Sequence, residues 1–164
     1  MSLKVIWITG ATSGLGRALI DEFTAAGHIV VGCGRRRKLI EQLQHEFATP
    51  HFFSTVDVAH DDEVAAFCQA AKSITGPPDL LLNNAAVVNV PAPLWEISAD
   101  EFDHLTATNI NGVANMIRHT APMMIEHGNR VIVNFSSCLL RPTSPQVSPH
   151  CPRHCTIQGL LPPH

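Results

Sequence analysis

Tyrosine is absent from the 164 residues of this chain, and lysine stands at only three positions, Lys4, Lys38 and Lys72. The absence of tyrosine excludes every mechanism in which a phenol of this chain donates or accepts a proton. Arginine and lysine total 11 against 14 acidic residues, and the formal net charge is -3. This charge excludes the positive field that attracts nucleic acids and anionic membrane surfaces, so we expect neither as a partner.

Long apolar segments and disulfide patterns are also missing. No apolar run approaches the roughly 20 residues of a membrane-spanning helix, and residues 1–10 resemble a strand rather than a cleavable leader. The five cysteines are an odd number without framework spacing, which fits a compartment that keeps thiols reduced. We therefore expect a soluble cytoplasmic protein of globular composition and one domain.

Five short apolar runs recur along the chain. They are nearly continuous rather than alternating, which indicates strands buried on both faces of a parallel sheet. Apolar residues at helical spacing lie between the runs and predict crossover helices. The pattern predicts an α/β fold with a Rossmann-type, doubly wound parallel sheet of about five strands. The runs cover residues 4–9, 29–33, 51–58, 79–84 and 130–135.

The clearest helix start is a capping box from Ser98 to Glu101, in which both side chains satisfy free amides of the first turn. We expect this helix to end at His127, and Pro122 to bend or fray its final turns. Six prolines fall within residues 138–164, too densely for a long helix or a central strand. We expect a Rossmann domain over residues 1–137 and an irregular tail rich in Pro, His and Cys over 138–164.

The strongest motif, Thr9-Gly-Ala-Thr-Ser-Gly-Leu-Gly16, follows the first run and precedes a helix that should begin near Leu15. Small residues let the backbone approach a pyrophosphate, and the helix N-terminus offers unpaired amides. An ordinary glycine turn is the alternative, which the position between strand and helix disfavours. The predicted cofactor contacts are Thr9, Gly10, Thr12, Ser13, Gly14, Leu15 and Gly16.

The second motif, Gly34-Arg-Arg-Arg-Lys38, follows the second run without a nearby carboxylate in the sequence. Folds that prefer NAD usually place an acid here, against the ribose 2′-hydroxyl. Guanidinium groups instead match a 2′-phosphate. A solvated basic helix start is the alternative, although cations there oppose the helix dipole. We therefore predict NADP(H) rather than NAD(H), with Arg35 and Arg36 as phosphate contacts.

The motif of residues 9–16 resembles the T-G-x-x-x-G-x-G pattern of the short-chain dehydrogenase/reductase family. Two further patterns follow in the family's order: Asp57-Val58, the pair that contacts adenine, and residues 83–86, which look like the N-N-A-G of the cofactor cleft. Ala86 replaces the last glycine and adds one methyl group to the cleft. The cofactor contacts that the resemblance implies are Asp57, Val58, Asn84, Ala85 and Ala86.

The same resemblance implies the catalytic residues. Asn109 begins an N-x-x-G pattern and would hold a proton-relay water, unless it is a buried asparagine that bonds its own helix or sheet. Ser137 would polarise a substrate carbonyl. The family's tyrosine, thirteen residues after this serine, and its lysine, four residues further on, are replaced by His150 and His154. Histidine is a common general acid. However, the His150 side chain is shorter than a tyrosine, and the lysine that holds the nicotinamide ribose in the family is also replaced.

The resemblance implies an NADP(H)-dependent oxidoreductase scaffold for a small carbonyl or alcohol substrate, with little or no turnover in this chain. Family members usually continue with two more strands, so the sheet is expected to be incomplete, with the fifth strand as an edge. Two alternatives stay open: a non-catalytic dinucleotide-binding or interaction module that forms homo- or hetero-oligomers through residues 98–127, and a poorly folded product. Histidines and cysteines of the tail lack the spacing of zinc sites, and no metal is predicted.

Overall fold

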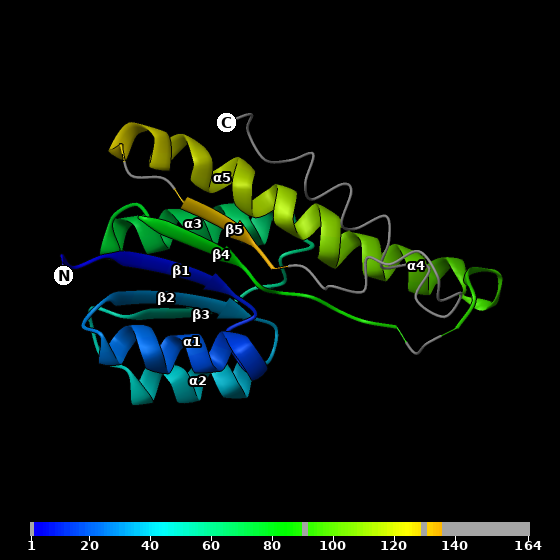
Figure 1. Cartoon of the computed structure of the whole chain (residues 1–164), viewed down its shortest axis with the longest axis horizontal. Helices are drawn as coiled ribbons and strands as arrows, with labels where there is room; N and C mark the ends of the chain where they lie inside the picture. Colours follow the sequence, from blue (N-terminus) through cyan, green and yellow to red (C-terminus); the bar gives the residue numbers. More distant parts are fainter. Residues whose placement is uncertain (1, 90–91, 129–130, 136–164) are drawn as a thin grey trace.

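The computed structural model describes residues 2–89, 92–128 and 131–135 (Figure 1). Ser137, His150 and the tail predicted over residues 138–164 lie outside them. Five parallel strands form one sheet in the order β3-β2-β1-β4-β5, which confirms the predicted α/β fold. The strands are β1 (Val5–Thr9), β2 (Ile29–Gly34), β3 (Phe52–Thr55), β4 (Leu80–Asn83) and β5 (Val131–Asn134).

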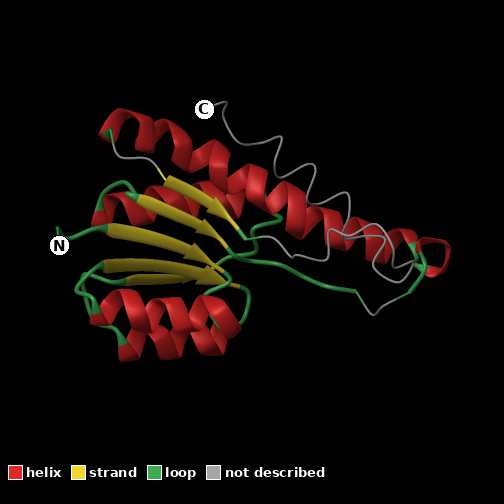
Figure 2. Ribbon diagram, viewed as in Figure 1, coloured by secondary structure: helices red, strands yellow, loops and turns green. Residues whose placement is uncertain are grey.

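Helices cover both faces of the sheet. Figure 2 shows α1 (Gly14–Ala25) and α2 (Arg37–Glu46) on one face, with α3 (Asp61–Thr75) and α5 (Gly112–His127) on the other. The strand order reverses between β1 and β4, because β2 and β3 lie on one side of β1 while β4 and β5 lie on the other. In doubly wound folds such a reversal opens a crevice at the carboxyl ends of the strands.

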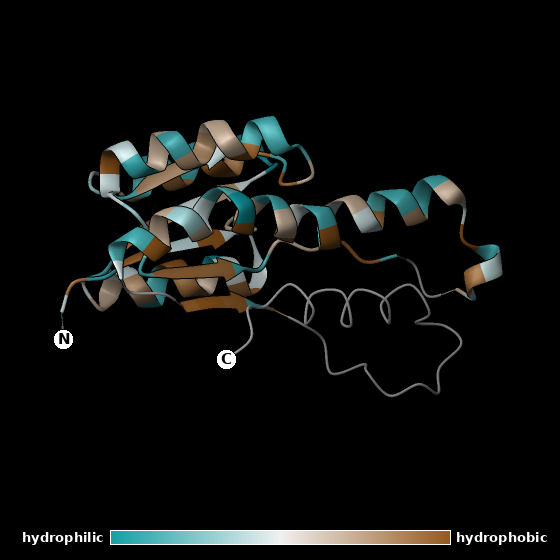
Figure 3. Ribbon diagram, turned by 90° about the horizontal axis from the view of Figure 1, so that it is seen from above, coloured by the Kyte–Doolittle hydropathy of each residue, from teal (hydrophilic) through white to brown (hydrophobic). Residues whose placement is uncertain are grey.

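The central strand β1 explains why the apolar runs are continuous. Its Trp7 is fully buried on the side of α3, where its ring centroid lies 5.7 Å from that of Phe67. The neighbours Ile6 and Ile8 belong to the second core, with Ile20 of α1. Alternate side chains therefore enter two cores, and both must be apolar. The strands are accordingly brown in Figure 3, whereas the helices show bands of teal and brown.

The helix predicted from Ser98 to His127 consists of three segments. These are α4 (Ala99–Thr106), a π-helical turn η2 (Ala107–Asn111) and α5, preceded by the short 3-10 helix η1 (Leu94–Glu96). The Ser98 hydroxyl accepts a hydrogen bond from the Glu101 amide at 3.2 Å, which confirms the serine half of the capping box. The predicted fraying at Pro122 is wrong, since α5 continues to His127 and ends at Gly128, whose φ is 88°.

The strand β5 is the outer strand on its side of the described sheet. Val131 and Val133 of this strand are 53% and 36% exposed, whereas Ile132 packs against the core beneath α5. The predicted sheet edge with uncovered apolar side chains is therefore present. Among the described residues, no helix combines the length and the apolar character that crossing a membrane requires.

Candidate functional site

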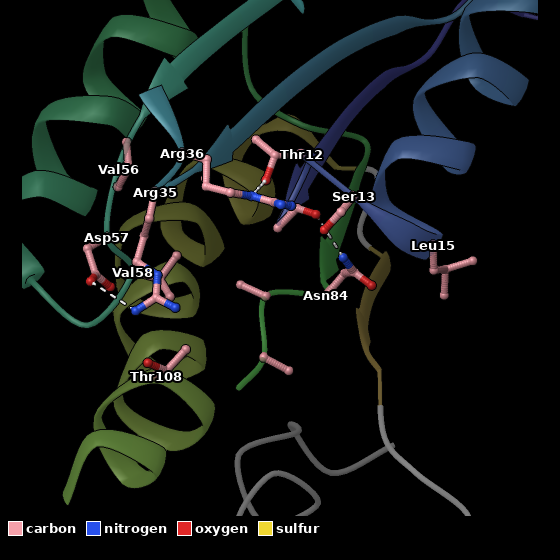
Figure 4. A pocket seen from close by; sticks show the side chains of 14 residues that line it. Thr12, Ser13, Leu15, Arg35, Arg36, Val56, Asp57, Val58, Asn84 and Thr108 are labelled. Carbon is pink, nitrogen blue, oxygen red and sulfur yellow. Dashed lines mark hydrogen bonds and ion pairs between the residues drawn. The ribbon is translucent and has the colours of Figure 1, made fainter. Parts of the chain in front are cut away.

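A cleft of about 490 Å³ opens at the carboxyl ends of β1, β2 and β4, where the strand order reverses (Figure 4). Most of the predicted cofactor contacts meet there, although they come from segments far apart in the sequence. The cleft is lined by Gly10, Thr12, Ser13, Leu15, Gly34, Arg35, Arg36, Val56, Asp57, Val58, Asn84, Ala85, Ala86 and Thr108. Thr9, Gly14 and Gly16, also predicted as contacts, are not among these lining residues.

The glycine turn between β1 and α1 is shaped by close approach. A Cβ atom on Gly16 would lie 2.2 Å from the Gly10 carbonyl oxygen, and Gly10 itself has a φ of 70°. Helix α1 begins at Gly14, one residue before the predicted start, and its first turn holds no acidic residue. Its free amides and positive dipole end are therefore open to an anion, which fits a pyrophosphate.

Thr9 holds the glycine turn in place through hydrogen bonds to the segment after β4. Its side chain is buried, and its hydroxyl accepts hydrogen bonds from the amides of Asn84 and Ala85 at 3.0 and 2.9 Å. The side-chain amide of Asn84 donates in return to the carbonyls of Thr9 and Gly10. These bonds join the end of β1 to the segment after β4. Thr9 is thus a positioning residue rather than a lining residue of the cleft.

The basic segment after β2 has carboxylate neighbours in three dimensions, contrary to the prediction. Arg35 lies 3.7 Å from the carboxylate of Asp57, and Arg37 bonds Glu41 at 3.0 Å. Arg36 instead donates from Nε to the Thr12 hydroxyl at 3.1 Å. Glu41 lies one turn after Arg37 in α2, whereas the loop after β3 carries Asp57 back to the end of β2. Two guanidinium groups still face the cleft, and they fit a phosphate beyond the pyrophosphate.

The far wall of the cleft is the loop after β3. The carbonyl of Val58 accepts a hydrogen bond from the Asn115 side chain at 3.0 Å. A Cβ atom on Gly112 would lie 2.6 Å from Cγ2 of Val58. The glycine of the N-x-x-G pattern is therefore required by the contact between α5 and this loop.

Asn109 clamps the segment that follows β4. Its side-chain oxygen accepts from the Val87 amide and its side-chain nitrogen donates to the Val87 carbonyl, both at 2.9 Å. The residue is buried. Both ends of the side-chain amide are therefore engaged with the Val87 backbone, so the side chain positions the segment that follows β4. Asn83 is likewise buried and donates to Asn134 of β5 at 2.8 Å.

Sequence reasoning missed three lining residues. Gly34 and Val56 each directly precede a predicted contact, Arg35 and Asp57, so including the flanking residues of each motif would have found them. Thr108 lies beside Asn109 in η2, and its buried hydroxyl has no hydrogen-bond partner within the described part of the chain. No residue pattern signals such a group, because its orientation depends on the π-helical turn.

Other candidate chemistry is limited within the described residues. The two cysteines there, Cys33 and Cys68, are free and buried. Burial raises the pKa of the Cys33 thiol far above its usual value and that of Cys68 to about 12, so neither is a thiolate near neutral pH. No cluster of possible metal ligands occurs in this part of the chain. The predicted catalytic residues Ser137 and His150 lie outside it.

Comparison with known proteins gives consistent matches. A family model described as short chain dehydrogenase matches residues 4–151. The NADPH-dependent pterin aldehyde reductase of Arabidopsis thaliana is 37% identical over 162 residues, which cover 98% of this chain and 67% of that protein. Serine 3-dehydrogenase of Rhizobium radiobacter is 33% identical over 138 residues, which cover 80% of this chain and 53% of that protein.

Solved structures agree with these sequence matches. A short-chain dehydrogenase from Streptomyces avermitilis superimposes with a TM-score of 0.89 at 27% identity, over 97% of this chain and 58% of the other. The 3-ketoacyl-(acyl-carrier-protein) reductase from Brucella melitensis, complexed with NADH, has a TM-score of 0.88 at 28% identity, over 96% and 66%. This chain therefore spans about half to two thirds of the length of the proteins it matches.

Proposed function

The chain belongs to the short-chain dehydrogenase family, as its motifs predicted, and from this premise we propose that it binds NADP(H) in the cleft at the carboxyl edge of the sheet. The observation that carries the proposal is the meeting of two kinds of phosphate partner in one cleft. The turn before α1 offers free backbone amides, and Arg35 and Arg36 offer guanidinium groups. The nucleotide-binding unit in this proposal covers residues 1–137.

Each group of lining residues has a part of the cofactor to hold. The turn that contains Gly10 would hold the pyrophosphate, Arg36 the 2′-phosphate, and Asp57 with Val58 the adenine. Asn84, Ala85 and Ala86 would border the inner part of the cleft. The nicotinamide ring, when bound, would supply or accept a hydride during reduction of a carbonyl or oxidation of an alcohol.

The choice of NADP(H) over NAD(H) has independent support. The Arabidopsis relative is NADPH-dependent by name, whereas the similar Brucella reductase is complexed with NADH. Family membership alone therefore leaves the choice open. The arginines at the end of β2 favour NADP(H), because their guanidinium groups would compensate the charge of a 2′-phosphate bound beside them.

Calorimetry with NADPH and NADH tests this proposal directly. We expect NADPH to bind at least roughly tenfold more tightly, since hydrogen bonds between charged groups are the strong ones. Equal affinities would contradict the NADP(H) assignment. If the protein unfolds cooperatively but binds neither NADPH nor NADH, the proposed nucleotide site is contradicted.

We expect little or no turnover by this chain. His150 stands where the family pattern has its tyrosine, and this position lies inside the span of the family model. Ser137 would remain to polarise a carbonyl, and Asn109 would position the cleft, but the proton donor and its lysine partner are replaced. NADPH oxidation should stay at background with a panel of carbonyl compounds that includes a pterin aldehyde. Measurable turnover that disappears in His150→Phe would make His150 the proton donor and contradict this expectation.

A second candidate function is a non-catalytic module that pairs with a full-length relative through α4 and α5. The coexistence of an intact dinucleotide cleft with a replaced tyrosine favours it. Mixed oligomers on co-expression with such a relative would support this function, and monomers under the same conditions would exclude it. The free thiols of Cys33 and Cys68 support a reducing compartment such as the cytoplasm for either function.

A further inference from the structure

Thr108 contributes a buried, unpaired hydroxyl to the dinucleotide cleft. The residue is 4% exposed, lines the cleft, and its Oγ1 atom has no hydrogen-bond partner among the residues that the structure describes. Buried polar groups are almost always paired in native proteins, because an unpaired one is destabilising. Such a group at the wall of a binding cleft points to a partner that arrives with the ligand.

Four other hydroxyls in the described helices are satisfied locally. Thr24, Ser73, Thr75 and Thr120 each donate to the carbonyl four residues earlier, at 2.6 to 3.0 Å. This back-bonding is the usual solution for threonine inside a helix. Thr108 departs from it, and it lies in the π-helical turn η2, where the spacing of the α-helical carbonyls is altered. The turn leaves the hydroxyl free for another partner.

The position of Thr108 indicates which part of the ligand its hydroxyl would contact. Figure 4 shows it beneath Asp57 and Val58, on the wall opposite Ser13 and Leu15 of the phosphate turn. Val58 is held there by the contact of its side chain with Gly112, four residues after Thr108. The apolar side chain of Val58 beside one hydroxyl suits a flat ring with polar edges. Adenine has ring nitrogens that accept and an amino group that donates, and a hydroxyl can do either.

We propose that the Thr108 hydroxyl hydrogen-bonds the adenosine half of the bound dinucleotide and is a further cofactor-binding residue of this protein. The inference rests on the proposed NADP(H) site and adds a contact that no motif of the sequence assigns. Its physical signature is unusual. Removal of the hydroxyl should weaken binding without destabilising the ligand-free protein, because no hydrogen bond is lost until the ligand is present.

The test compares Thr108→Val, which keeps the shape, with Thr108→Ser, which keeps the hydroxyl. We expect Thr108→Val to bind NADPH and 2′,5′-ADP roughly five- to tenfold more weakly, the usual effect of one lost hydrogen bond. Its ligand-free melting temperature should equal or exceed that of the wild type. Thr108→Ser should bind within about twofold of the wild type, and binding of nicotinamide mononucleotide should not change in either variant.

A matched control is Thr120→Val in α5, where the threonine is fully buried but donates to the Met116 carbonyl. This variant should show the opposite pattern, a lower melting temperature with unchanged affinity. Wild-type affinity in Thr108→Val, or a melting temperature that falls as in Thr120→Val, would overturn the inference while leaving the NADP(H) site intact. Failure of the wild-type protein to bind 2′,5′-ADP would instead overturn the proposed function and this inference together.

Discussion

At the scale of single residues, the two arginines of the cleft have different neighbours and therefore different roles. Arg35 faces the carboxylate of Asp57 at 3.7 Å, so part of its charge is already compensated. Arg36 is oriented by a neutral hydroxyl, that of Thr12 at 3.1 Å. A hydroxyl fixes the guanidinium without competing for its charge. Arg36 is thus the better prepared partner for an incoming phosphate.

Replacement of Arg36 by alanine should change cofactor preference more than affinity for dinucleotides in general. We expect NADPH to bind roughly 10- to 100-fold more weakly, because hydrogen bonds to a charged group are lost, while NADH binds within about twofold of the wild type. Calorimetry with both dinucleotides measures the ratio. Arg37→Ala is the control, since Arg37 pairs with Glu41 and does not line the cleft. Equal losses for NADPH and NADH in Arg36→Ala would contradict the role of Arg36.

The residues that could be predicted from sequence are those whose role is set by local sterics. Gly10 and Gly16 are required by the turn itself, and their spacing is visible in the chain. The pairing of Arg35 with Asp57 could not be predicted, because it depends on how the loop after β3 returns to β2. Thr108 could not be predicted either, since a threonine beside an asparagine looks like any helical residue until the π-helical turn is known.

At the scale of secondary structure elements, the contact between α5 and the loop after β3 holds one wall of the cleft in place. A Cβ atom on Gly112 would approach Cγ2 of Val58 to 2.6 Å, and the branched valine has little freedom to turn away. The Asn115 side chain fixes the same loop through the Val58 carbonyl. The wall of the cleft that contains Val58 therefore depends on one glycine in the helix opposite.

A double-mutant cycle at this contact should show strong coupling. Gly112→Ala should lower the free energy of unfolding by about 1–3 kcal/mol, as overpacking does, despite the better helix propensity of alanine. In the Val58→Ala background, Gly112→Ala should lower the free energy of unfolding by less. The two substitutions should show a coupling free energy of at least about 0.5 kcal/mol. Urea denaturation of the four proteins measures it. Additive effects would show that the helix and loop adjust independently.

Strand positions were predictable, whereas their ends and the long helix were not. Continuous apolar runs locate the five described strands. Burial of both faces explains the runs of the inner strands β1, β2 and β4, whereas the run of β5 is apolar although Val131 and Val133 are exposed. The third run extends to Val58, but β3 ends at Thr55, since Val56, Asp57 and Val58 leave the sheet to line the cleft. Apolar spacing continues through η2, so the periodicity of the helix does not reveal the π-helical turn.

At the scale of the whole molecule, Asp79 joins three strands at the amino edge of the sheet. Its carboxylate accepts from the Val5 amide at 2.8 Å and from the Lys4 ammonium at 3.1 Å, and its carbonyl accepts from the Val131 amide. Burial raises the pKa of the Asp79 carboxyl, but the Val5 amide and Lys4 outweigh it and hold the pKa below its usual value. Folding therefore favours the ionised carboxylate.

This shift predicts the acid dependence of stability. A group with a lowered folded pKa stabilises the protein fully above its unfolded pKa, about 3.9 for aspartate, and loses this contribution as the pH falls through the folded pKa. Asp79→Asn should therefore be less stable than the wild type at pH 6, and the difference should shrink towards pH 2.5. Urea denaturation across this range measures it, with the exposed Asp103→Asn as control. A difference independent of pH would contradict the role of the Asp79 charge.

Within the described residues β5 is an exposed outer strand of the sheet, and we expect this edge to promote self-association. Val131 and Val133 are exposed on the outer strand of the described sheet. Val131 also borders a hollow of about 350 Å³, which is lined by Phe23 and Leu80 as well as by Lys4, His28 and Asp79. An apolar edge with unpaired backbone groups invites a second chain to add to the sheet, and edge lysines prevent this in natural proteins.

Val133→Lys should therefore raise the protein concentration at which self-association begins. The free energy of unfolding should change by no more than about 0.5 kcal/mol, the usual range for a surface site, since the side chain is already partly solvated. Light scattering over a concentration series measures the association. Ile74→Lys is the matched control, because Ile74 is 50% exposed on α3 and not on the sheet edge. If both lysine variants delayed association equally, net charge rather than the β5 edge would be the cause, since either lysine changes the charge by the same amount.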